Sequence, residues 1–208
     1  MRLWSDSFAG SQPIPERYAL GRPHPTHHVE LADNISPHLA WADIPADTRS
    51  LVFIGHDRDV PSRGDDVNKK GRLVPPDLLR VDFFHLVMVD LAPTPGEFVE
   101  GELSKGVTPH GKPGPDGPRG TRCGLNDYTG WFKGDASMEG QYYGYDGPCP
   151  PWNDSIVHHY LFSLYAVDVA RCGVDGTFTG PEVRAAITGH VLAQSVIEGT
   201  YTINSKAK

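Results

Sequence analysis

The sequence predicts a mainly β fold, an antiparallel β-sandwich of two sheets with one or two short helices and long loops, and three observations support it. The 208 residues include 23 Gly and 19 Pro, and so many turn-forming residues favour short strands and long loops. Three runs, at 51–57, 83–91 and 158–168, are rich in β-branched and aromatic residues. Only one pattern is helical, so an antiparallel sandwich is favoured over βαβ units.

The first third of the chain contains one strong strand. Residues 11–30 are rich in Pro and His, which predicts a loop with at most a short strand from Arg17 to Leu20. The segment 33–41 combines a turn signal with apolar residues that can seat the ring of Trp41. Residues 51–57 (LVFIGHD) have the pattern of a buried strand that leaves the core. Residues 61–80 are rich in Asp, Lys, Arg, Gly and Pro, which predicts a charged loop.

The remainder of the chain supplies the other predicted elements. Residues 83–91 form a second strand and residues 158–168 a third, which is apolar enough to be buried on both faces. Between them, residues 104–147 are rich in Gly and aromatic residues and lack a sustained period. A loop of this length is unusual inside a compact domain. Finally, the pattern predicts a helix over 181–194 that begins with a proline, followed by a closing strand over 196–203.

Length and charge limit the classes of protein that fit. The length fits one domain, so we expect a single domain over 1–208 with a long loop insertion at about 104–145. A net charge of -7 disfavours nucleic acid and anionic membrane surfaces as partners, because both require a basic face. No stretch approaches the roughly 20 apolar residues of a membrane span, and the first residues lack the apolar run of a secretory signal. Three cysteines are too few for a disulfide framework, so we expect a cytoplasmic protein with no stable membrane insertion.

Polar side chains collect at the ends of the three predicted strands. Asp57 and Asp59 follow the first strand two residues apart, so both carboxylates face the same side. His85 lies near the start of the second strand, and His158 and Tyr160, also two apart, begin the third. If these strand ends lie together, two imidazoles, one phenol and two carboxylates converge.

Such a cluster is suited to binding an anion. An imidazole N–H can donate to an anionic oxygen while a carboxylate holds the other ring nitrogen, and Asp57 is the candidate for that carboxylate. The segment GYDGPCPP at 144–151 supplies the remaining wall, where the N–H groups of Gly147 and Cys149 can point at an anion and Pro151 stiffens the backbone. The sequence therefore predicts that the protein binds phosphate or a phosphorylated head group and requires no cofactor and no metal.

Five segments resemble, in order, the motifs of the phosphatidylethanolamine-binding family, which includes the Raf kinase inhibitor proteins and their bacterial relatives. They are DNISPHLAW, LVFIGHDRDVP, FFHLVMVDL, GYDGPCPP and HHYLFSLYAVD. The resemblance spans roughly Ile14 to Ile203. It implies a two-sheet antiparallel fold, a small pocket for phosphate, acetate or phosphorylated head groups, and a homodimer like those of bacterial relatives. The residues that match family pocket positions are Asp57, Asp59, His85, His158, Tyr160 and the prolines Pro150 and Pro151.

Three departures from the family pattern lie around this predicted pocket. Arg58 replaces the proline between the two aspartates, and Cys149 stands where many members have glycine or alanine. The connection from Pro151 to His158 is slightly longer than usual. These departures affect the shape of the pocket, and the insertion at 104–145 is a candidate lid or partner surface.

Two other functions remain open beside a binding module. No G-x-S-x-G, H-E-x-x-H or P-loop motif occurs, yet Asp57, His85 and His158 are suitable metal ligands and Cys149 is a potential thiolate nucleophile. A hydrolase or metal-dependent enzyme that uses the same pocket is therefore the alternative. The resemblance also permits a kinase-regulatory or signalling role, or inhibition of a protease. We expect His158→Ala to weaken phosphate binding about tenfold.

Overall fold

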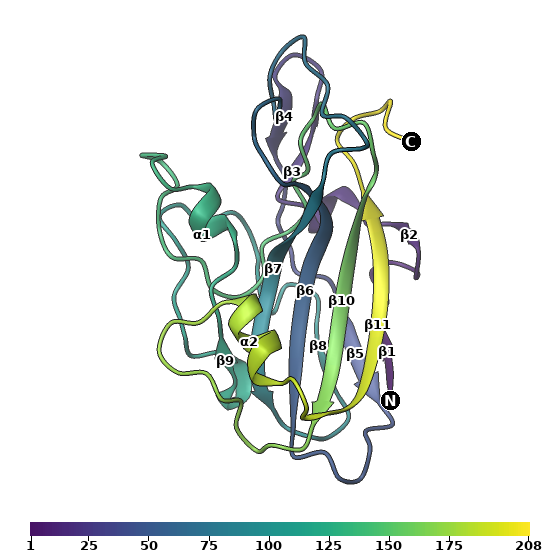
Figure 1. Ribbon diagram of the computed structural model, residues 1–208, viewed down its shortest axis with the longest axis vertical. Helices are drawn as coiled ribbons and strands as arrows, with labels where there is room; N and C mark the ends of the chain where they lie inside the picture. Colours follow the sequence, from purple (N-terminus) through teal and green to yellow (C-terminus); the bar gives the residue numbers. More distant parts are fainter.

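The computed structural model describes residues 1–208, and its regular secondary structure is mostly β-strand, joined by long loops (Figure 1). The short strands are β1 (Arg2–Trp4), β2 (Gln12–Pro13), β3 (Gly21–His24), β4 (His28–Leu31), β5 (Leu39–Ala42), β8 (Gly96–Phe98) and β9 (Arg122–Cys123). The long strands are β6 (Ser50–Pro61), β7 (Arg80–Leu91), β10 (His158–Val167) and β11 (Val191–Tyr201). The two α-helices are α1 (Tyr128–Trp131) and α2 (Gly180–Ala186).

Two sheets form the body of the molecule. The larger sheet has the order β2-β11-β10-β6-β7-β9, and its strands are antiparallel except for the β2–β11 pair. The smaller sheet has the order β1-β5-β8, and β3 and β4 form a separate hairpin. The main core includes Leu39 and Trp41 of the smaller sheet and Phe53 and Phe162 of the larger one. The predicted mainly β sandwich with short helices is confirmed.

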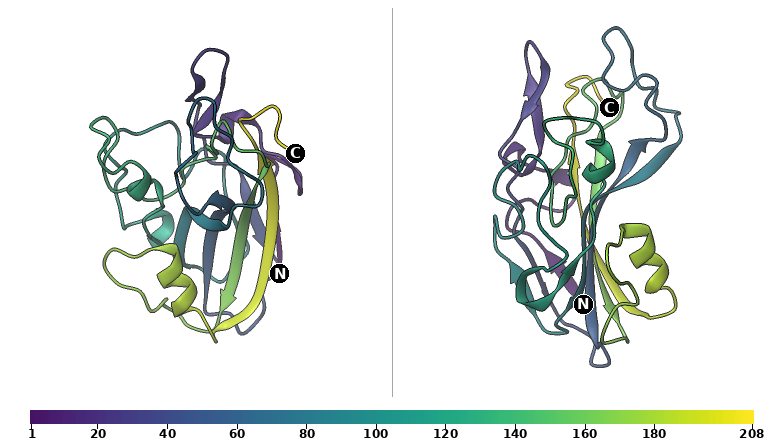
Figure 2. Two further views of the ribbon diagram at one scale, coloured as in Figure 1. Left: turned by 45° about the horizontal axis from the view of Figure 1, so that its top comes forward. Right: turned by 90° about the vertical axis from the view of Figure 1, so that its left-hand side faces the viewer.

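The larger sheet is covered on both faces, which explains the continuous apolar runs in its central strands. In β6, Leu51 and Phe53 belong to the core shared with the smaller sheet, whereas Val52 and Ile54 belong to a second core that includes Val183 of α2. Figure 2 shows α2 on one side of the sheet and the N-terminal strands on the other. Because both faces are buried, the strand shows no alternation of polar and apolar residues.

A β-bulge in β7 sets the direction of His85. Gly55 pairs with Leu86 and His56 pairs with Phe84, so His85 is an extra residue without a partner on β6. Leu86 belongs to the core between the sheets and Phe84 to the core under α2. The bulge therefore allows His85 to point to the same side of the sheet as its neighbour Leu86, an effect common beside functional sites.

Two local predictions were wrong. The short strand expected from Arg17 to Leu20 is absent, because Glu16–Tyr18 form a 3₁₀ turn and the N–H of Leu20 donates to the carbonyl of Pro148. The helix expected over 181–194 ends at Ala186. Gly189 adopts a φ of 84°, after which β11 starts and pairs with β10. Pairing with a long neighbouring strand outweighed the helical pattern of the sequence.

The segment 104–145 contains short elements rather than one structureless loop. It includes β9 and α1, and two of its aromatic residues, Tyr142 and Tyr145, are fully buried. Trp131, in contrast, remains 55% exposed. Most of this segment is therefore packed against the domain, and α1 presents one large aromatic side chain to the solvent.

Candidate functional site

The register of three strands brings the predicted residues together. Asp57 of β6 lies opposite Tyr160 of β10 and opposite Phe83 of β7. A cavity of about 220 Å³ opens there. Its lining includes six of the residues predicted from the sequence, namely Asp57, His85, Cys149, Pro150, Pro151 and Tyr160.

Three other predicted residues lie beside this cavity without lining it. The carboxylate of Asp59 accepts hydrogen bonds from the backbone N–H of His159 at 2.8 Å and from its Nδ1 at 2.7 Å. The N–H of Gly147, which we expected to point at an anion, donates to Oδ1 of Asn34 at 2.8 Å. His158 is the third, and its surroundings differ most from the expectation.

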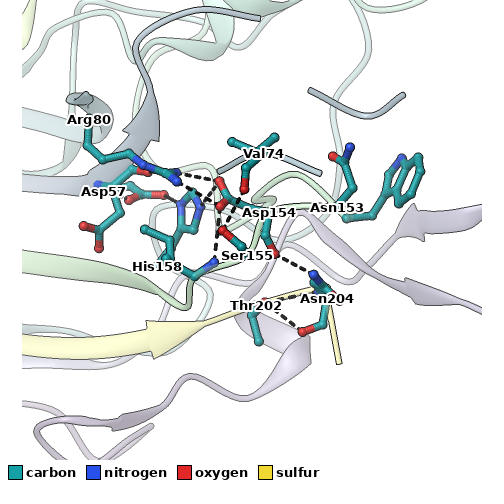
Figure 3. A network of polar contacts seen from close by, with 12 residues as sticks. Asp57, Val74, Arg80, Asn153, Asp154, Ser155, His158, Thr202 and Asn204 are labelled. Atoms are coloured by element: carbon teal, nitrogen blue, oxygen red, sulfur yellow. Dashed lines mark hydrogen bonds and ion pairs between the residues drawn. The ribbon is translucent and has the colours of Figure 1, made fainter. Parts of the chain in front are cut away.

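His158 lies between two carboxylates and is fully buried (Figure 3). Its Nδ1 is 2.7 Å from Oδ2 of Asp57, which is the expected orienting contact, and its Nε2 is 3.1 Å from Oδ2 of Asp154. Burial lowers the pKa of His158, but the charges and hydrogen bonds of the two carboxylates outweigh burial and raise it to about 9. The ring is thus an imidazolium whose two N–H groups are both engaged, and it has no free nitrogen for a ligand.

Arg80 completes this buried network. Its Nη1 and Nη2 lie 2.6 and 3.0 Å from the two carboxylate oxygens of Asp154, a bidentate pair visible in Figure 3. Burial raises the pKa of Asp154, but hydrogen bonds from His158 and Arg80 outweigh burial and lower it. The negative charges of Asp57 and Asp154 are therefore balanced by the positive charges of His158 and Arg80 beneath the cavity. Sequence reasoning missed Asp154, whose only signal was the longer connection before His158.

His85 is held in the opposite protonation state. Its Nδ1 lies 2.7 Å from the backbone carbonyl of Asp146. Because a carbonyl can only accept, Nδ1 must carry the proton. Burial lowers the pKa of His85 and outweighs the favourable effects of Asp57 and the carbonyl. The neutral ring therefore has an unprotonated Nε2, which makes no hydrogen bond within the chain.

Tyr160 belongs to the lining of the cavity and carries a buried polar atom. The side chain is 2% exposed and its buried hydroxyl has no hydrogen-bond partner. Burial raises the pKa of Tyr160 well above its ordinary value, and the charge of Asp57 and the closeness of the hydroxyl to the Asp57 carboxylate add to this effect, so the hydroxyl keeps its proton. Both oxygens of Asp57 are already engaged, by the N–H of Asp59 and by His158. A buried hydroxyl without a partner requires an explanation, and a bound ligand supplies one.

The outer wall of the cavity is largely apolar. Phe83 and Tyr128 pack edge to face with ring centroids 5.0 Å apart, and the exposed Trp131 extends the wall toward the solvent. Arg63 is the one cationic side chain in the lining. The cavity therefore combines a small polar base with an apolar mouth, the usual composition of a small-molecule site.

The residues that favoured an enzyme lie in unsuitable surroundings. Burial raises the pKa of the Cys149 thiol to about 12, so the group stays neutral and weakly nucleophilic at neutral pH. No group of three His, Cys, Asp or Glu side chains has the geometry to hold a metal ion.

Neither helix is long and apolar enough to cross a membrane.

Comparison with known proteins identifies one family. A model of the family described as phosphatidylethanolamine-binding protein matches residues 4–202. The UPF0098 protein YbhB of Escherichia coli is 27% identical over 203 residues, which cover 97% of this chain and 100% of YbhB. A solved structure of a phosphatidylethanolamine-binding protein homologue from Chlamydia trachomatis superposes with a TM-score of 0.61 at 25% identity, covering 96% of this chain and 95% of that chain. Escherichia coli YbcL, described as a member of the mammalian family, superposes with a TM-score of 0.67 at 21% identity, covering 97% of each chain.

Proposed function

Because this chain belongs to the phosphatidylethanolamine-binding protein family, we propose that its cavity binds a small anion, namely phosphate or the phosphate group of an organic molecule. The family resemblance noted in the sequence is confirmed. The observation that carries the proposal is the buried hydroxyl of Tyr160, which belongs to a residue of the cavity lining and makes no hydrogen bond within the chain. A phosphate oxygen placed there satisfies this hydroxyl and recovers the free energy of a buried hydrogen bond.

The proposed contacts are those of the six predicted residues in the lining, Asp57, His85, Cys149, Pro150, Pro151 and Tyr160. Asp59, Gly147 and His158 act through their neighbours instead, because the hydrogen-bonding groups expected to face a ligand are already paired. In this proposal His158 neutralises the charge of Asp57, which would otherwise repel an anion.

The mouth of the cavity supports an organic phosphate as the ligand. Phe83 and Trp131 offer apolar surface to an organic group, and Arg63, which pairs with Asp65 in the exposed rim, is the cation of the lining. These residues come from β7, α1 and the loop after β6. The structure adds no support for hydrolysis, and regulation of a protein kinase stays a prediction of the resemblance.

Replacing Tyr160 by Phe is expected to weaken phosphate binding about tenfold, equivalent to about 1.4 kcal/mol. The substitution removes one oxygen that has no partner in the free protein, so the free energy of unfolding should stay equal or rise slightly. Isothermal titration calorimetry with inorganic phosphate measures the first effect and urea unfolding the second.

The matched control is Tyr145→Phe. The Tyr145 hydroxyl is also buried but donates to the carbonyl of Tyr18 at 2.8 Å and does not line the cavity. This variant should lose about 1 kcal/mol of stability and retain phosphate affinity. Equal phosphate affinity in Tyr160→Phe and the wild type would rule out the assignment of this hydroxyl.

We further propose a homodimer that pairs through the outer edge of β11. This strand is paired with β2 only at Gly199 and Thr200, so its first half is an open edge of the sheet, where Val191, Leu192 and Val196 are exposed. An open edge of this kind is a template for pairing with another strand. Light scattering should give twice the mass of the chain for the wild type and a monomer for Val196→Lys, and a wild-type monomer at all concentrations would contradict the proposal.

A cytoplasmic location is also part of the proposal. All three cysteines are free. Free thiols are typical of the reducing environment of the cytoplasm. Cell fractionation with a tagged chain would test this location.

A further inference from the structure

We infer that the cavity selects anions that carry a hydrogen-bond donor, so that hydrogen phosphate binds and sulfate, which has the same shape but no proton, is rejected. The inference rests on the proposed function and adds a rule for which anions are accepted: inorganic phosphate satisfies the rule, and an organic phosphate satisfies it only in the form whose phosphate group keeps a proton. It follows from the tautomer of His85, the charges around that ring, and the unpaired hydroxyl of Tyr160.

The first step concerns His85. Its Nδ1–H donates to the carbonyl of Asp146 at 2.7 Å, which leaves Nε2 as an acceptor. Nε2 has no partner within the chain, and the ring lines the cavity. A ligand that meets this atom must therefore donate a hydrogen bond to it.

The second step is that the ring is fixed in this orientation. The carboxylate of Asp146 accepts hydrogen bonds at 2.8 Å from Nδ2 of Asn34 and from Nδ2 of Asn126, and it forms an ion pair at 2.8 Å with Lys112. Asp146 is 2% exposed, so its backbone is held from several sides. Turning the ring of His85 to offer its N–H to a ligand would leave the buried carbonyl without a donor, which costs free energy.

The third step concerns charge. The titratable groups around His85 are Asp57 and His56 on β6, His158 and Tyr160 on β10, Tyr128 on α1, and Asp146 and Cys149 before β10. The cations nearby are paired, since His158 lies between Asp57 and Asp154, and Lys112 binds Asp146. Arg63, the cation in the lining, lies at the exposed rim and forms an ion pair with Asp65 at 3.3 Å. The base of the cavity therefore has no unpaired cation that could hold an anion by charge alone.

The fourth step combines the two free atoms. The Tyr160 hydroxyl can donate to an unprotonated oxygen, while Nε2 of His85 can accept from a protonated one. Hydrogen phosphate offers both kinds of oxygen on one phosphorus. Sulfate offers only acceptors at neutral pH, so one of its oxygens would face the lone pair of Nε2. Sulfate can bind only if His85 takes a proton from the solvent, and burial of the ring opposes this protonation.

The test compares inorganic phosphate with sulfate by isothermal titration calorimetry at pH 7 and pH 8. We expect phosphate to bind at least about tenfold more tightly than sulfate at pH 7, because sites that hydrogen-bond a ligand O–H discriminate strongly against analogues that lack it. Phosphate keeps a proton at both pH values. Residual sulfate binding requires proton uptake, so its affinity should fall further, by about tenfold, between pH 7 and pH 8.

His85→Gln provides the variant that removes the selection. A glutamine side chain can donate from its amide nitrogen, so the ratio of the two affinities should fall to within about threefold, with circular dichroism as the check on folding. If that variant does not fold, the affinities of the wild type for phosphate and sulfate still test the inference. Equal binding of sulfate and phosphate by the wild type at both pH values would overturn the inference and leave the proposed anion site intact, whereas binding of neither anion would overturn the proposed function as well.

Discussion

Asp154→Ala is expected to lower the free energy of unfolding by about 3–5 kcal/mol, because removing one partner of a buried ion pair leaves an uncompensated charge. The side chain of Asp154 is 0% exposed and that of its partner Arg80 is 12% exposed. The same carboxylate also holds Nε2 of His158. Arg80 and His158 would both lose a buried partner. Urea unfolding monitored by circular dichroism measures the decrease in the free energy of unfolding.

An exposed ion pair supplies the matched control for this prediction. Arg171 and Asp175 lie 2.6 Å apart, with side chains 62% and 84% exposed. Asp175→Ala should cost less than about 1 kcal/mol, because solvent screens the pair. If Asp154→Ala were as mild as this control, the buried network would not stabilise the fold in the way described.

Raising the pH from 6.5 to 9 is expected to remove about 3 kcal/mol of stability through His158 alone. Its pKa in the folded protein is about 9, above the ordinary value of about 6.5 in an unfolded chain. The folded state therefore binds the extra proton in this window, and the stabilisation is fully present below pH 6.5 and is lost as the pH rises through 9. Urea unfolding at pH 6.5, 7.5, 8.5 and 9.5 measures the slope.

A second histidine, His56, affects stability in a different pH window. Burial lowers the pKa of His56 to about 4, so its contribution to stability grows between pH 4 and 6.5 and does not overlap with that of His158. Asp154→Asn removes one of the two carboxylates that raise the pKa of His158 and should flatten the alkaline slope. A wild-type stability that does not change between pH 6.5 and 9 would contradict an imidazolium at this position.

The sequence was sufficient for the fold and for the approximate place of the candidate site. The runs at 51–57, 83–91 and 158–168 became β6, β7 and β10, the central strands of the larger sheet, because a strand buried on both faces has a strong apolar signal. The i, i+2 spacing of His158 and Tyr160 correctly placed both side chains on one face, toward the end of β6 where Asp57 lies.

Other features depend on contacts that a single sequence does not reveal. The spacing of His158 gave no sign that Asp154, four residues earlier, would take its second nitrogen. The bulge that turns His85 arises from the register between β6 and β7, which local sequence does not determine. The tautomer of His85 depends on a backbone carbonyl 61 residues away in the chain. Long-range contacts of this kind decide which imidazole faces the ligand.

The most direct test of the anion site is a titration of the histidine-¹⁵N-labelled protein with inorganic phosphate, followed through the ring nitrogen signals in long-range ¹H–¹⁵N spectra. We predict that Nε2 of His85 starts at the shift of an unprotonated acceptor and moves saturably as phosphate binds, whereas the two nitrogens of His158 stay those of an imidazolium and move little. A titration in which His85 does not respond, or in which His158 responds as the principal ligand, would contradict the account.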